Sequence, residues 1–191
     1  MRATPIAVVV ALASTLALSA QTMGEPVWGG ANGGLLSIGI SRTSSTEPSE
    51  HVGLEISLRN VGQKDFVVNL GVMLANGKAM FPNAIRLLDL EPTGRSRELH
   101  FKEPSFVAGR VDDFIVALRS GATYTFTTST DQYWSPSTKE FALKWVPGVH
   151  RISARFEGRA ASHPNLDTAG VKLLNFWVGT VNSGVVQFAA R

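Results

Sequence analysis

The stretch KEFALKWVPGVHRISARFE, residues 139–157, is the clearest indication of the fold class of this chain. In its second half polar and apolar side chains alternate, and four alternate residues share one face of an extended chain: His150, Ile152, Ala154 and Phe156. A period of two is typical of a strand with one buried face. We therefore expect a strand after the central Pro147-Gly148 pair.

The first half of the stretch predicts a second strand, with three side chains directed inward: Phe141, Leu143 and Trp145. Pro147 and Gly148 suit the two central positions of a type II turn, because proline presets φ and glycine accepts a positive φ. Type II turns match the twist of tight hairpins poorly. The corner is therefore expected to carry the chain from one sheet to another.

Short segments of the same kind recur along the chain, at residues 35–41, 52–59, 66–73, 84–90, 97–101, 114–118, 123–128 and 184–190. Turn residues separate them, and no helical period extends over ten or more residues. Two long loops, 102–112 and 158–183, interrupt the series. This pattern predicts an all-β, antiparallel β-sandwich of about seven to nine strands.

The first twenty residues differ from the rest of the chain. Arg2 is their one charge, residues 6–18 are almost entirely apolar, and small residues lead up to Ala20. This order predicts a signal peptide, residues 1–20, with the exported chain starting near Gln21. An uncleaved membrane anchor is the alternative, although the apolar run is short for a spanning helix.

The remainder divides into a flexible, Gly-rich lead-in, residues 21–34, and a single domain, residues 35–191. Of all 191 residues, 44% are hydrophobic and 17% are charged, as in a globular domain. The formal net charge is +3, and no run of Lys and Arg is present, so we expect no nucleic-acid partner. We also expect no membrane association after cleavage. The lack of cysteine and of Asn-x-Ser/Thr favours a bacterial protein, periplasmic or extracellular.

The turns form a recognisable series: RNVG at residues 59–62, LRSG at 118–121, WVPGVHRISARF at 145–156 and WVGTVNS at 177–183. This series resembles the immunoglobulin-like sandwiches of exported bacterial proteins of unknown function. The series resembles the BsuPI-type proteinase inhibitor domain more weakly, through the asparagine turn and the Pro-Gly corner that the two share. The resemblance implies an immunoglobulin-like fold from about Leu35 onward. It implies no particular function, because its motifs are structural.

Catalytic and metal-binding motifs are missing from the sequence. The chain has no cysteine, no Gly-x-Ser-x-Gly and no Asp-x-Asp-x-Asp, and its four histidines form no His-Glu-x-x-His pair. His150 is expected to be a hydrogen-bonded core residue. The segment 163–167 could supply metal ligands, but a solvated loop is the preferred interpretation. We therefore predict no enzyme activity, no cofactor and no metal.

Aromatic residues in polar loops are the best binding candidates, because large aromatics anchor partners and stack on sugars. The candidate binding residues are Asp131, Tyr133, Trp134 and Trp177. Trp134 could instead cover the end of the core, and the resemblance assigns Trp177 to a structural lid.

The function predicted from the sequence is that of an exported, non-catalytic module that binds a protein or a carbohydrate. One alternative is a secreted proteinase inhibitor, for which the loop 102–112, with Pro104 and Arg110, is the best candidate. The other is a metal-dependent enzyme with an unrecognised site.

Overall fold

A computed structural model of the chain describes residues 24–30, 34–43, 51–74, 77–103, 109–163 and 165–190. The predicted signal peptide, residues 1–20, lies outside this range. The first six strands are β1 (Val27–Gly30), β2 (Leu36–Arg42), β3 (Gly53–Asn60), β4 (Phe66–Leu74), β5 (Ala79–Phe81) and β6 (Ile85–Leu90). The last six are β7 (Ser96–Phe101), β8 (Val111–Leu118), β9 (Thr123–Ser129), β10 (Tyr133–Trp134), β11 (Gly148–Gly158) and β12 (Gly179–Ala190). Two 3₁₀ helices complete the described elements: η1 (Thr130–Gln132) and η2 (Leu166–Leu173).

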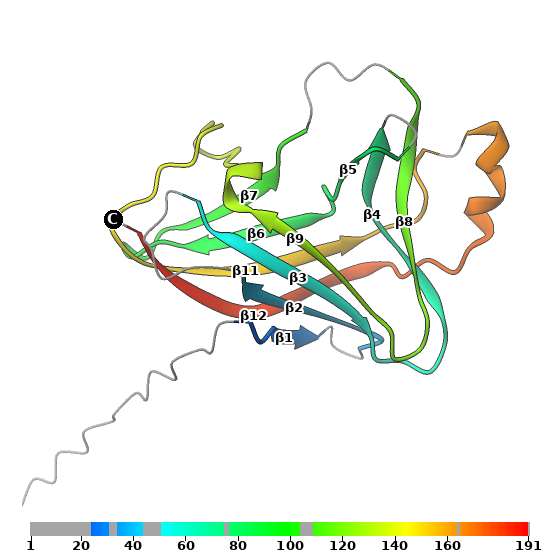
Figure 1. The fold of residues 1–191 in the computed structure, drawn as a ribbon, viewed down its shortest axis with the longest axis horizontal. Coiled ribbons are helices and arrows are strands. Elements are labelled where there is room, and N and C mark those ends of the chain that lie inside the picture. Colours follow the sequence, from blue (N-terminus) through cyan, green and yellow to red (C-terminus); the bar gives the residue numbers. More distant parts are fainter. Residues whose placement is uncertain are drawn as a thin grey trace, which may run out of the picture.

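The strands form three antiparallel sheets, which confirms the predicted all-β class (Figure 1). The first sheet has the order β1-β2-β3-β9, the second β10-β7-β6-β11-β12 and the third β5-β4-β8. The third sheet continues from the first, since β3 leads into β4 and β8 leads into β9 (Figure 1). The chain segment before β12 adds one parallel bridge to it, between Val67 and Phe176.

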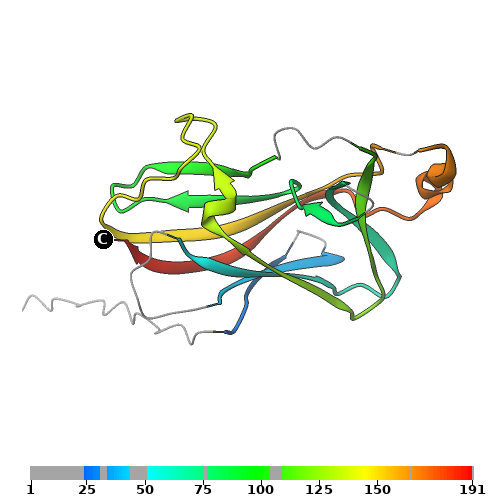
Figure 2. The same ribbon diagram turned by 45° about the horizontal axis from the view of Figure 1, so that its top comes forward.

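One hydrophobic core is shared between the first and second sheets. Strand β2 contacts β11 and β12, and Figure 2 shows the first sheet lying against this part of the second. Fully buried side chains come from both sides, among them Leu36, Ile38, Ile40, Leu54, Ile56 and Leu58 of the first sheet and Leu87, Leu99, Ile152 and Phe156 of the second. Because each strand alternates, the opposite face of the second sheet is left for polar side chains.

The second half of the stretch 139–157 forms β11, and its predicted inner face is confirmed: His150, Ile152, Ala154 and Phe156 are all fully buried. Gly148 has the expected positive φ, +128°. The first half contradicts the prediction, because residues 141–147 form no strand and Phe141 is 67% exposed. Side chains take the place of a partner strand here: Arg97 donates to the carbonyl of Lys144 and His150 to the carbonyl of Val146.

Other differences lie at the strand ends. Part of the Gly-rich lead-in forms β1, which pairs with β2, and β12 begins at Gly179, five residues before the predicted start. The twelve strands of the described chain exceed the predicted seven to nine. The surplus consists of β1, β5 and β10, which have two to four residues each. Strands of two to four residues are too short to show a period of two in the sequence. Their pairing with neighbouring strands holds them in place.

Candidate functional site

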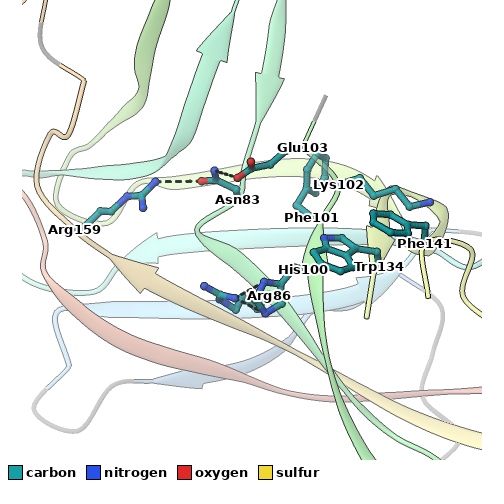
Figure 3. A pocket seen from close by; sticks show the side chains of 9 residues that line it. All are labelled: Asn83, Arg86, His100, Phe101, Lys102, Glu103, Trp134, Phe141 and Arg159. Atoms are coloured by element: carbon teal, nitrogen blue, oxygen red, sulfur yellow. Dashed lines mark hydrogen bonds between the residues drawn. The ribbon is translucent and has the colours of Figure 1, made fainter. Parts of the chain in front are cut away.

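A surface pocket of about 510 Å³ lies on the outward face of the second sheet, over β6, β7 and β10 (Figure 3). The strand register explains its floor. Trp134 of β10 pairs with His100 of β7, and His100 pairs with Arg86 of β6. These three residues form one row across the sheet, opposite the buried residues of the same strands. A volume of this size is in the range of sites for small ligands.

The positive charge of Arg86, in the floor of the pocket, is neutralised by two neighbouring carboxylates, Glu98 and Glu157. Its Nη1 atom lies 3.1 Å from Oε1 of Glu98, and its Nε atom lies 3.4 Å from Oε2 of Glu157. Nη1 also donates to Nδ1 of His100 at 2.6 Å, and Nε2 of His100 lies 2.7 Å from Glu98. Nη1 of Arg86 also contacts Nε2 of His100. Arg86 and His100 are thus held rigidly by their neighbours.

The aromatic wall of the pocket consists of Trp134 and Phe141 (Figure 3). Their rings are stacked at a centroid distance of 4.9 Å and an interplanar angle of 4°. Trp134 also contacts the ring of His100 edge-on, which fixes it to the floor. Phe141 is held from one side only, so most of its ring is exposed to solvent.

Two further cations and one carboxylate complete the pocket. Nζ of Lys102 donates to the backbone oxygen of Asp131 at 2.5 Å, and Nη2 of Arg159 donates to Oδ1 of Asn83 at 3.2 Å. The Asn83 amide nitrogen in turn donates to Oε1 of Glu103 at 3.3 Å. In Figure 3, Arg159 and Lys102 lie at opposite ends of the pocket. Asn83 therefore separates Arg159 from Glu103 instead of letting them form an ion pair.

The structure brings the four predicted binding residues to three different places. Trp134 lines the pocket, and Asp131 is exposed beside it, where its backbone oxygen holds Lys102. Tyr133 is fully buried against Phe101, with the ring centroids 5.2 Å apart, and this burial raises the pKa of its hydroxyl. Trp177 stacks on Phe156 at 5.6 Å, over the core. Trp134 is therefore the one of these side chains that lines the pocket.

A second cluster brings Ser162, His163 and Asp113 together, but not as a catalytic triad. Ser162 Oγ lies 3.0 Å from Oδ1 of Asp113 and 2.9 Å from Nδ1 of His163. A triad needs the serine hydroxyl to pass its proton to histidine, whereas here the hydroxyl donates a hydrogen bond to the carboxylate. Asp113 also accepts hydrogen bonds from the backbone amides of Ser162 and His163 and from Asn69. Its role is therefore to anchor the segment that follows β11.

The hydrogen bonds also set the charge of Asp113. Burial alone would raise the pKa of this carboxyl, but the amide groups of His163 and Ser162 and the side chain of Asn69 outweigh burial. The pKa consequently lies below the ordinary aspartate value. A carboxylate whose pKa is lowered in this way is a weaker general base than an ordinary aspartate.

A third cluster is buried beneath the segment 139–147, which we call the strap. Arg97, whose side chain is 2% exposed, bonds Asp89 at 2.8 Å and Glu91 at 2.9 Å. It reaches the strap through Glu140 at 3.3 Å. Nδ1 of His150 lies 2.9 Å from Oδ1 of Asp89 and Nε2 lies 2.8 Å from the oxygen of Val146. This cluster holds the strap, and hence Phe141, in place.

Sequence reasoning missed several pocket residues. Alternation in segment 84–90 places Arg86 on the outward face, but its neighbours depend on the register of two other strands. Arg159 and Asn83 meet across 76 positions of sequence, for which no local signal exists. Phe141 was predicted to lie in the core because it alternates with Leu143, and the structure places it on the surface.

No protein-family model matches the chain, and no curated protein matches it. Within the described ranges, no group of three or more His, Asp or Glu side chains is arranged to hold a metal ion. The described helices include none with the length and apolarity needed to cross a membrane. The predicted inhibitory loop, 102–112, lies partly outside the described residues, at 104–108.

Proposed function

We propose that this chain is an exported, non-catalytic binding module with an immunoglobulin-like β-sandwich fold. Its ligand site is the pocket bounded by Trp134 and Phe141. The observation that carries this proposal is the stacked pair itself, in which Phe141 exposes 67% of its surface beside a 510 Å³ pocket. An exposed aromatic ring with a fixed orientation is a low-entropy anchor for a ligand.

The rigid support of the site favours binding. Trp134 is fixed by His100 and Phe141, and the strap that carries Phe141 is held by Arg97 and His150. A preorganised site loses little conformational entropy when a ligand arrives. The Ser162 cluster, in contrast, offers no activated nucleophile, because the Ser162 hydroxyl donates its hydrogen bond to the anchoring carboxylate of Asp113.

Export and fold assignment are supported by the sequence and by the shared core. The charged Arg2, the apolar residues 6–18 and the small residues before Gln21 favour a cleaved signal peptide. Two antiparallel sheets that share one core are the arrangement expected of an immunoglobulin-like sandwich. The partner is a protein or a carbohydrate outside the cytoplasm, with no part for nucleic acid or membrane.

Arrays of immobilised glycans and of extracellular peptides test this proposal. The wild-type chain should bind a subset of probes, and Phe141→Ala should reduce that binding at least tenfold. Leu173→Ala is the matched control, because Leu173 is an apolar residue that is 89% exposed and lies in η2, outside the pocket. Binding that is insensitive to Phe141→Ala, or lost equally in both variants, would place the ligand elsewhere and contradict the proposal.

A further inference from the structure

Two cations of the pocket have no carboxylate partner within the part of the chain that the structure describes. Lys102 bonds only a backbone oxygen and Arg159 only an amide oxygen. Lysine has three donors and arginine five, so each of the two cations keeps donors that no described carboxylate uses. Arg86, in contrast, is neutralised by Glu98 and Glu157 beside it on the same face of the sheet. The unused positive charge therefore lies at the two ends of the pocket and not on its floor.

The middle of the pocket offers different chemistry. Among the residues that the structure describes, Asn83 alone donates a hydrogen bond to Glu103, so the remaining lone pairs of this carboxylate can accept hydrogen bonds from a ligand. Hydroxyl groups meet this requirement. The outer face of Phe141 adds an apolar surface, on which the C–H groups of a sugar ring can pack because the ring face carries partial negative charge.

From this arrangement we infer that the ligand is an anionic oligosaccharide with at least two acidic sugars. One carboxylate pairs with Arg159 and another with Lys102, while a ring between them packs on Phe141 and donates a hydroxyl hydrogen bond to Glu103. Charge complementarity at both ends requires two acidic groups, and the pocket volume is in the range of small-ligand sites. This inference rests on the proposed function and names the ligand class of the same site.

A single-stranded oligonucleotide also combines spaced negative charges with stacking surfaces. Glu103 argues against it, because each acidic sugar carries hydroxyl groups that can donate hydrogen bonds to this carboxylate, whereas the sugar-phosphate backbone of DNA has no such donor between its ends. The sequence also has no Lys/Arg cluster of the kind that tracks a phosphate backbone. A saccharide uses Glu103 as an acceptor, so the observations favour the saccharide.

Calorimetric titration of the full chain with defined probes tests the inference. The probes are uronate tetrasaccharides of three kinds (galacturonate, mannuronate and a hyaluronan fragment), their methyl esters and a thymidine tetranucleotide. The esters keep the sugar backbone and remove the charge. At least one uronate should bind, its ester should bind at least tenfold more weakly, and added salt should weaken the binding of the acid form.

Substitutions of single cations test which side chains bind the acidic groups of the ligand. Arg159→Gln and Lys102→Gln should each weaken uronate binding by roughly tenfold, since each removes a charge-assisted hydrogen bond. Arg151→Gln is the matched control: Arg151 is an exposed arginine of β11, eight residues before Arg159, or about 26 Å along an extended strand. It should leave the affinity unchanged, and circular dichroism checks that every variant is folded.

Each contrary result has a separate meaning. Equal affinity for a uronate and its ester, lost in Phe141→Ala, overturns the anionic class and leaves the proposed function standing. Tighter binding of the tetranucleotide overturns the saccharide class. If no uronate binds, the inference is wrong, and the array experiment with Phe141→Ala then decides separately whether the proposed function is also wrong.

Discussion

Phe156 is the residue at which the period-two interpretation of the sequence can be tested most directly. Its side chain is fully buried and stacks on Trp177. Phe156→Ala should lower the free energy of unfolding by about 3–5 kcal/mol, the usual cost of truncating a buried aromatic residue. Urea denaturation measures this loss.

The control for Phe156→Ala is Arg151→Ala on the outward face of the same strand. Arg151 is exposed, so its truncation should change stability by no more than about 0.5 kcal/mol. Arg155 is a poorer control, because it bonds Asn182 and Glu98. Equal losses for Phe156→Ala and Arg151→Ala would contradict the assignment of inner and outer faces.

Gly148 is the residue whose backbone conformation matters most at the start of β11. Its φ is +128°, and an added Cβ would lie 2.8 Å from Cγ of Pro92. Gly148→Ala should therefore destabilise the protein by about 1–3 kcal/mol, although it removes no core atom. Thermal denaturation measures the loss, and Gly170→Ala, where an added Cβ meets nothing within 4 Å, provides the control. A Gly148→Ala protein as stable as the wild type would show that the strain is absent.

At the scale of elements, the strap depends on the buried charges beneath it. Arg97→Met leaves Asp89 and Glu91 in the interior without their shared cation, which should cost about 3–5 kcal/mol. Arg86→Met, in the half-exposed network of the pocket floor, should cost about 1 kcal/mol or less. Urea denaturation compares the two variants.

Trypsin provides an independent readout of the strap itself. Lys144 lies in the strap, and its backbone oxygen accepts a hydrogen bond from Arg97. Cleavage after Lys144 should accelerate in Arg97→Met under native conditions and stay at the wild-type rate in Arg86→Met. Equal cleavage rates in both variants would mean that Arg97 does not hold the strap.

Asp113, which anchors the loop after β11, should make the stability of the protein fall as the pH is lowered. The pKa of Asp113 is lower in the folded protein than in the unfolded chain, so the unfolded chain binds the proton more tightly. The contribution of Asp113 to stability is therefore complete above the ordinary aspartate pKa of about 3.9 and disappears as the pH falls through the lower folded value. Urea denaturation at a series of pH values from 6 downward should show that the free energy of unfolding falls less steeply with pH in Asp113→Asn than in the wild type.

Asp131→Asn is the control for this pH dependence, since Asp131 is an exposed residue. It should leave the acid profile of the wild type unchanged. An Asp113→Asn profile that runs parallel to the wild-type profile would contradict the anchoring role of this carboxylate.

For the whole molecule, β1 links the N-terminal segment to both sheets. It pairs with β2, and an added Cβ at Gly29 would lie 2.1 Å from the backbone oxygen of Asn182 in β12. A chain that starts at Gln21 keeps β1, whereas a chain that starts at Leu35 lacks it. The shorter chain should lose on the order of 2 kcal/mol through lost pairing and exposed apolar surface. Equal urea midpoints for the two chains would show that β1 contributes nothing.

Much of the fold follows from local pattern. Leu54, Ile56 and Leu58 of β3 alternate with polar neighbours, and all three are buried as that pattern predicts. The strap shows where the pattern misleads: Phe141 and Leu143 alternate in the same way, yet Phe141 is exposed. Alternation reports a preference for one face, and it produces a strand only where a partner strand is available to complete the backbone hydrogen bonds.

The sequence by itself determined the all-β class, the inner face of β11 and the binding candidate Trp134, because side-chain period and residue type are local properties. Only the tertiary structure decided that Trp134, His100 and Arg86 form one row, that Phe141 stacks on Trp134, and that Arg159 reaches Asn83. These contacts depend on the register between strands and on the path of the strap. Register is set by the packing of the whole core, which no short segment encodes.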